Sequence, residues 1–116
     1  STNSILERIY NQWVPANHPV AVLLAKIVGS PTASPTNNNI IALNTALTNS
    51  VNQNWGSQVA AGRLMLVDMY AALSNRTTGA GGDYADALHP NQTGYDKMAD
   101  AWRTSLVASG VLQRCP

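Results

Sequence analysis

Charged side chains are scarce in this sequence of 116 residues. Aspartate, glutamate, lysine and arginine together make up 11% of it, and the formal net charge is only +1. Binding to nucleic acid or to an anionic membrane surface needs concentrated positive charge, so neither partner is predicted. The polar residues are largely Asn, Ser and Thr. Such a neutral, hydrogen-bonding surface suits a secreted, extracellular protein that handles uncharged polymers.

Long hydrophobic runs are also missing. The longest, Val20 to Val28, has the size of a strand and contains Lys26, whereas a bilayer-spanning helix needs roughly 18 apolar residues. Hydrophobic residues still make up 45% of the sequence, as in globular chains, and the length fits one domain or part of one. Because the sequence begins with Ser1 and not with an initiator Met, we expect a processed chain or a fragment.

A single cysteine, Cys115, lies one residue from the end of the sequence. A lone cysteine is either an inert buried thiol or one half of a disulfide to another chain or segment, and both interpretations stay open. Two N-glycosylation sequons, which begin at Asn75 and Asn91, agree with secretion.

Hydrophobic periodicity predicts alternating helices and strands. Apolar residues repeat at helical spacing over residues 3–13 and run almost without alternation over 20–28, as in a parallel strand that is covered on both faces. A second helix is predicted over 38–52, where Asn44 either faces solvent or bonds the neighbouring loop, and a second buried strand over 64–69. A strand, a helix and a strand in this order form a βαβ unit, so we expect parallel strands with a right-handed crossover.

The remaining sequence predicts a long loop and a last helix. Residues 70–92 are rich in glycine and lack apolar periodicity, and a structureless loop of this length is usually functional. The last helix is predicted over 93–108, with Thr93 and Asp96 as a capping box and Gly110 as its stop. Two buried strands leave open sheet edges and uncovered faces, so we expect polypeptide outside this sequence to complete the sheet.

The segment from Asp86 to Pro90 has the residue types of half a catalytic triad. In acyl transfer a histidine takes a proton from a nucleophile, while a carboxylate holds its other nitrogen. A turn would bring the Asp86 carboxylate to Nδ1 of His89 and leave Nε2 facing a cleft, and Pro90 restrains His89 toward extended backbone. The alternative is that His89 is an exposed loop residue and Asp86 a turn former, because Asp-x-x-His alone is a weak pattern. No second histidine or cysteine lies at ligand spacing, so no metal or other cofactor is predicted.

The longer stretch DALHPNQTGYDKMADAW, residues 86–102, resembles the last block of the SGNH (GDSL-type) hydrolases, in which Asp-x-x-His-Pro-Asn precedes a Gly-Tyr and a Met-Ala helix. Upstream, AVLLAKIVGSPT resembles the penultimate strand of that family, IIALNTAL its crossover helix and LVDMYAAL its last strand. The resemblance covers essentially the whole chain and is closest to small secreted acetylxylan and other carbohydrate acetyl esterases. It implies a three-layer α/β/α fold with a flavodoxin-like parallel sheet, of which residues 1–116 form the C-terminal part of a single domain.

The resemblance also implies roles for individual residues. His89 is the general base and Asp86 the acid that orients it, in a Ser-His-Asp esterase that removes acetyl or similar acyl groups from carbohydrate. Pro90 and Asn91 shape the loop, and we expect no glycan on Asn91 because it would obstruct the cleft. The nucleophilic serine and the Gly and Asn oxyanion donors of the family have no counterpart here. The implied partner is therefore an N-terminal fragment of the same hydrolase, bound non-covalently or through Cys115, without which little activity is expected.

Three further polar residues are weaker candidates. Ser30 follows a strand but lacks the strand-to-helix elbow of hydrolytic serines. Asp68, at the end of the second strand, is a rival triad acid, although such residues more often bond loop amides. His18 is expected to be an exposed loop residue.

Trp55 is the one tryptophan that we consider for stacking on sugars, because Trp13 and Trp102 lie on stripes that face the core.

Two interpretations compete with the esterase. The first alternative is a non-catalytic glycan- or protein-binding module on a hydrolase-like scaffold. The second is a degradation product without a function of its own.

Overall fold

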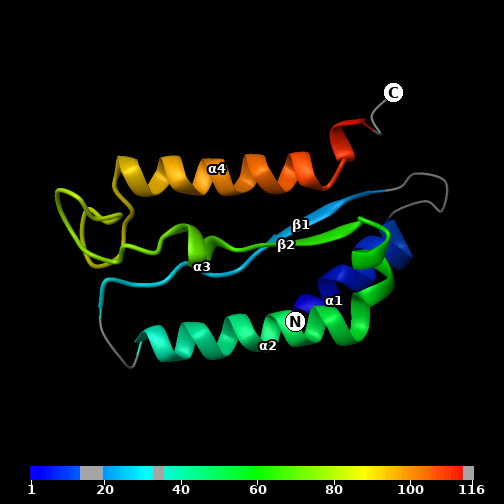
Figure 1. Ribbon diagram of the computed structural model, residues 1–116. Coiled ribbons are helices and arrows are strands. Elements are labelled where there is room, and N and C mark those ends of the chain that lie inside the picture. The colour runs from blue at the N-terminus through cyan, green and yellow to red at the C-terminus, as the bar shows by residue number, and fades with distance from the viewer. Residues whose placement is uncertain (14–19, 33–35, 114–116) are drawn as a thin grey trace.

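The structure is a computed structural model that describes residues 1–13, 20–32 and 36–113. It is a mixed α/β arrangement in which α2 and α4 lie on opposite sides of two paired strands (Figure 1). In chain order its elements are α1 (Thr2–Glu7), the π-helical turn η1 (Arg8–Trp13), β1 (Val22–Ala25), α2 (Thr36–Ala60), β2 (Leu64–Val67), α3 (Met69–Ala72), α4 (Gln92–Ala108) and the 3-10 turn η2 (Val111–Gln113).

The two strands pair in parallel, as predicted. Val22 lies opposite Leu64, and Ala25 lies opposite Val67. The long helix α2 connects the strands and packs on one face of the sheet, while α4 packs on the other face (Figure 1). The predicted βαβ unit is therefore present, and the loops that follow both strands leave the sheet at the same end.

Both strands are shorter than predicted, because side chains take over the main-chain groups where the pairing ends. The amide group of Asn44, on α2, bonds the main-chain N–H and the main-chain oxygen of Ile27, each at 2.8 Å, so β1 does not fill residues 20–28. This confirms the second of the two predicted roles of Asn44. The carboxylate of Asp68 caps α3, so β2 does not fill 64–69.

The crossover helix is longer than the predicted range of 38–52. α2 continues to Ala60 through a local break at Trp55, where φ is −130° and ψ is 19°. Val51 and Trp55 are both buried against the sheet, and this packing extends the helix beyond the predicted end. The chain turns only at Gly62, whose φ of 65° suits a residue without a Cβ.

The main hydrophobic core lies between α2 and the sheet. Trp55 is a buried member of this core, and its indole N–H donates to Oδ1 of Asn3 at 3.1 Å. Because Trp55 is buried, the one tryptophan that we considered for stacking on sugars is not available for it. The buried members of the core are Leu6, Val51, Trp55 and Leu64, with Tyr10, Val22, Leu24, Leu47 and Leu66 packed against them.

The other two tryptophans were predicted to face the core, and this is wrong for the described chain. Trp13 is 63% exposed, and Trp102 is exposed as well. Trp13 belongs to the π-helical turn η1, whose wider winding moves side chains off the stripe that an α-helix would bury. Trp102 lies on α4, which turns only part of its predicted stripe toward the sheet.

The last helix begins at an earlier cap than predicted. Oδ1 of Asn91 accepts the main-chain N–H of Gly94 at 3.0 Å, so Asn91 is the N-cap of α4. The predicted capping box of Thr93 and Asp96 is wrong, because the Asp96 carboxylate instead accepts from the side chain of Gln92 at 2.7 Å. The predicted stop is confirmed: α4 ends at Ala108, and Gly110 follows with a φ of 66°.

Apolar surface remains open around the sheet. β1 has β2 as its one strand neighbour among the residues that the structure describes, and all four residues of β1 are partly exposed. Several large apolar side chains of the helices are also exposed, among them Ile5, Ile41, Leu43, Tyr95, Trp102 and Val107. No helix within the described ranges has both the length and the apolarity to cross a membrane.

Candidate active site

Residues 83–91 form a loop whose two ends are hydrogen-bonded to each other. The main-chain N–H of Asn91 donates to the main-chain oxygen of Asp83 at 3.0 Å, and the N–H of Ala85 donates to the oxygen of His89 at 2.8 Å. Between these bonds Tyr84 and Pro90 form an antiparallel bridge. Only residues 86–88 therefore lie beyond the closed base of the loop.

Asp86 and His89 contact each other at the end of this loop. Nδ1 of the His89 ring lies 2.9 Å from Oδ2 of Asp86 and 3.1 Å from Oδ1. Oδ1 also accepts the main-chain N–H groups of Leu88 at 2.8 Å and of His89 at 2.7 Å. The acid thus holds the ring by the nitrogen that the sequence pattern suggested, and the main chain in turn holds the acid.

These hydrogen bonds set the ionisation of the acid. The bond from the His89 main-chain N–H, the contact with the His89 ring and the bond from Leu88 N–H together lower the pKa of Asp86 from 3.8 to about 2. The carboxyl group is therefore ionised at neutral pH and acts only as an acceptor, so Nδ1 of a neutral His89 ring must carry the proton. Nε2 is then the basic nitrogen, which has no hydrogen-bond partner among the described residues.

The pair is accessible in the described chain. The side chains of His89 and Asp86 are 64% and 58% exposed. A hollow of about 410 Å³ adjoins the loop at Ala87, and both polar and apolar groups line it. No group of three or more His, Cys, Asp or Glu side chains is placed to hold a metal ion within the part of the chain that the structure describes. The residues that line the hollow are Pro31, Thr32, Arg76, Thr77, Thr78 and Ala87.

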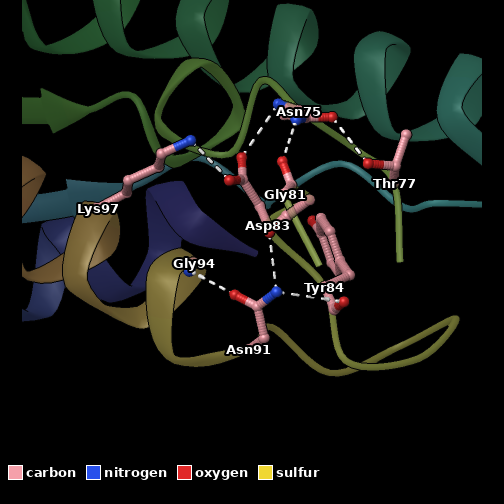
Figure 2. Close-up of polar contacts among 9 residues, drawn as sticks. Asn75, Thr77, Gly81, Asp83, Tyr84, Asn91, Gly94 and Lys97 are labelled. Carbon is pink, nitrogen blue, oxygen red and sulfur yellow. Dashed lines mark hydrogen bonds and ion pairs between the residues drawn. The ribbon is translucent and has the colours of Figure 1, made fainter. Parts of the chain in front are cut away.

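Three residues that sequence reasoning missed anchor this loop (Figure 2). The Asp83 carboxylate is buried and accepts from Nζ of Lys97 at 2.6 Å. Tyr84 is buried as well, and its hydroxyl donates to the main-chain oxygen of Gly29, in the segment that follows β1. An isolated acid in a glycine-rich stretch was a weak signal for Asp83. Lys97 reads in the sequence like any exposed helix residue, and Tyr84 carries no local signal.

Ser30 is not joined to His89 by a hydrogen bond. Its hydroxyl donates to the main-chain oxygen of Ala87 at 3.4 Å and accepts the N–H of Thr32 at 3.1 Å. Its main-chain N–H and oxygen both bond the side chain of Asn37. Through these contacts Ser30 links the segment after β1 to residues 83–91, which we call the site loop.

Asp68 has the structural role that the sequence favoured. Its carboxylate lies 2.8 Å from Nζ of Lys26 and accepts the N–H of Ala71 at 3.0 Å. Partial burial raises the pKa of Asp68, but the bonds from Lys26 and Ala71 outweigh this effect and the net pKa is lowered. Of the other predicted residues, His18 and Cys115 lie outside the described residues.

The amide of Asn91 is fully used within the protein. Besides the cap made by Oδ1, Nδ2 donates to the main-chain oxygen of Gly82 at 2.8 Å. A glycan on Nδ2 would replace one of the two hydrogens that this amide donates to Gly82 and Tyr84, and the absence of a glycan there stays a prediction. At the other sequon, Asn75 is exposed, although its Nδ2 donates to the oxygen of Gly81 at 2.6 Å.

Comparison with models of protein families, with curated proteins and with solved structures gave no match to this chain.

Proposed function

We propose that this chain supplies the general base and its orienting acid to a serine esterase of the SGNH type. The observation that carries the proposal is the contact of Asp86 with Nδ1 of His89, which leaves Nε2 basic, exposed and without a partner among the residues that the structure describes. Nε2 takes the proton of a serine hydroxyl as its oxygen attacks the ester carbonyl, and then gives this proton to the departing alcohol. The same nitrogen activates the water that releases the acid from the acyl-serine.

The nucleophile is proposed to come from polypeptide outside these 116 residues. The open edge of β1 supports this. Val22 and Lys26 direct their N–H groups toward β2, to the main-chain oxygens of Arg63, which precedes this strand, and of Val67, its last residue. Because main-chain groups alternate along a strand, those of Leu23 and Ala25 point to the opposite edge. A further strand of the three-layer SGNH fold would pair there and cover apolar surface of β1.

The proposed substrate is an acylated neutral carbohydrate, such as an acetylated plant polysaccharide. The hollow beside Ala87 is lined by three threonines and one arginine, whose hydroxyl and guanidinium groups suit a ligand rich in hydroxyl groups. The low charge of the chain suits a neutral polymer in the same way. Localisation outside the cell follows from this substrate class as part of the proposal.

The proposal is tested in the protein or assembly in which this chain naturally occurs. Native mass spectrometry is expected to show additional polypeptide of comparable size, either continuous with this chain or bound to it. That material should hydrolyse nitrophenyl acetate, and His89→Ala should lower kcat by at least about 100-fold. The matched control is Gln92→Ala, an exposed position at the start of α4.

An unchanged kcat in the His89→Ala variant would remove His89 from the mechanism. If the described chain instead unfolds cooperatively as a lone monomer and binds glycan without hydrolysing esters, the non-catalytic binding module is the correct interpretation.

A further inference from the structure

Asp83 is a buried charge at the base of the site loop. Its side chain is only 1% exposed, and a carboxylate at such a place is costly unless it is paired and hydrogen-bonded. Oδ1 lies 2.6 Å from Nζ of Lys97, and Oδ2 accepts the main-chain N–H of Asn75 at 3.0 Å (Figure 2). Asp83 therefore satisfies both oxygens with partners from two other parts of the chain.

The main chain of Asp83 completes the junction. Its N–H donates to the oxygen of Asn75 at 3.0 Å, and its oxygen accepts the N–H of Asn91 at 3.0 Å. Asn75 follows α3, Asn91 caps α4, and Lys97 lies one turn into α4. One residue thus joins the segment after α3, both ends of the site loop and the last helix.

The first turn of α4 lies directly against this junction. A Cβ added to Gly94 would come within 2.2 Å of the main-chain oxygen of Asp83, so the helix and the loop approach as closely as a glycine allows. The Asn91 side chain bridges the same gap, because it accepts from Gly94 (Figure 2) and donates to the main-chain oxygen of Gly82. These contacts at Asp83 therefore fix the orientation of the loop 83–91 relative to the first turn of α4.

We propose that Asp83 and Lys97 are positioning residues for the reaction, which set the orientation of His89 through the base of the loop. The inference rests on the proposed function, in which His89 is the general base. Without the ammonium group, the buried Asp83 carboxylate keeps one partner and moves toward water. That movement breaks the closure between Asp83 and Asn91, and with it the geometry in which Asp86 holds the ring.

This role differs from general stabilisation of the fold. The Lys97 ammonium bonds the buried Asp83 carboxylate at the base of the loop, and its side chain is partly exposed. Its loss acts on the orientation of Nε2, which matters when the proton is transferred and not when substrate binds. The expected signature is therefore a change in kcat at nearly constant KM, together with a changed hydrogen-bonding state of the His89 ring.

The test compares Lys97→Met with Lys97→Arg and with Arg103→Met in the active protein that contains this chain. Lys97→Met and Arg103→Met each remove one positive charge from α4. Arg103 is a matched control because its pair with Asp100 is on the surface, with side chains 71% and 72% exposed. Lys97→Arg keeps a cation within reach of Asp83 and should restore the function.

Two readouts are measured. In Lys97→Met, the amide hydrogens of Leu88 and His89, which donate to Asp86, should exchange at least about tenfold faster. The ¹⁵N signals of the His89 ring should also shift from a protonated Nδ1 toward a mixture of the two tautomers. kcat should fall by about 10- to 100-fold with KM within about twofold, since small misplacements of a catalytic group have effects of this size. Lys97→Arg should lie within about threefold of the unchanged protein, and Arg103→Met should be indistinguishable from it.

Unchanged exchange and ring signals in Lys97→Met would overturn the proposal, and so would an equal effect of Arg103→Met. If Lys97→Met does not fold, Asp83→Asn, which keeps the shape and the acceptor oxygen, is measured in its place against Asp100→Asn, with the same expectations. Failure of the proposed function looks different. In that case His89→Ala leaves ester hydrolysis unchanged, while amide exchange and the ring signals still decide whether Lys97 positions the loop.

Discussion

The buried hydroxyl of Tyr84 donates a hydrogen bond to the main-chain oxygen of Gly29, which ties the segment after β1 to the loop that carries Asp86 and His89. Burial raises the pKa of the Tyr84 hydroxyl, so this group remains a donor throughout the neutral range. The segment that follows β1 and the loop 83–91 are therefore joined by this hydrogen bond.

We expect Tyr84→Phe to weaken this connection without altering packing. The substitution leaves the Gly29 oxygen without its side-chain donor, so the free energy of unfolding should fall by about 1–3 kcal/mol. Tyr95→Phe is the control, because Tyr95 is exposed on α4, and it should change the free energy by less than about 0.5 kcal/mol. Urea unfolding of the two variants measures both values. If Tyr84→Phe and Tyr95→Phe have the same free energy of unfolding, the hydrogen bond of the Tyr84 hydroxyl does not stabilise the fold.

The low pKa of Asp86 predicts how the loop responds to acid. This pKa is about 2 in the folded protein and lies below its ordinary value of 3.8, so the stabilisation by the ionised carboxylate is complete above 3.8. It is lost as the pH falls through about 2. The amide proton shifts of Leu88 and His89 should therefore titrate with a midpoint near 2. A midpoint near 3.8 would contradict the hydrogen bonds around Asp86, and Asp86→Asn should abolish this titration.

The cap of α4 predicts different costs for two neighbouring residues. Asn91→Ala removes the acceptor for Gly94 N–H and the donor to Gly82, so it should lower the free energy of unfolding by about 1–2 kcal/mol. Thr93→Ala removes the cap that the sequence suggested and should change the free energy by less than about 0.5 kcal/mol. Both substitutions abolish the same sequon, so glycosylation cannot explain a difference between them. A larger loss in Thr93→Ala would restore the predicted capping box.

The features that could be predicted from the sequence are those that depend on residues close together in the chain. The parallel strands follow from their continuous apolar runs, and the contact of Asp86 with His89 spans only three residues within one turn. The sequence pattern did not predict the end of α2, because the packing of Trp55 in the core extends the helix beyond residue 52. Burial of that side chain, and hence its unsuitability for binding, also depends on tertiary contacts.

The anchoring of the site could not be predicted for the same reason. Lys97 and Asp83 are 14 residues apart, and they meet because the loop folds back on the first turn of α4. Nothing in the immediate sequence of Lys97 separates it from Arg103, whose pair with Asp100 remains at the surface. The exposure of Trp13 likewise depends on a π-helical turn that the hydrophobic pattern does not specify.

The closed base of residues 83–91 has a consequence for the timing of activity under the proposed function. The acid and the imidazole already touch within a segment that is held by its own main chain and by α4, so no rearrangement of this segment has to accompany the arrival of a serine. If the two parts are separable, ester hydrolysis should appear at the rate of their encounter and rise in proportion to the concentration of either one. Association of the two parts would then be the step that activates the enzyme.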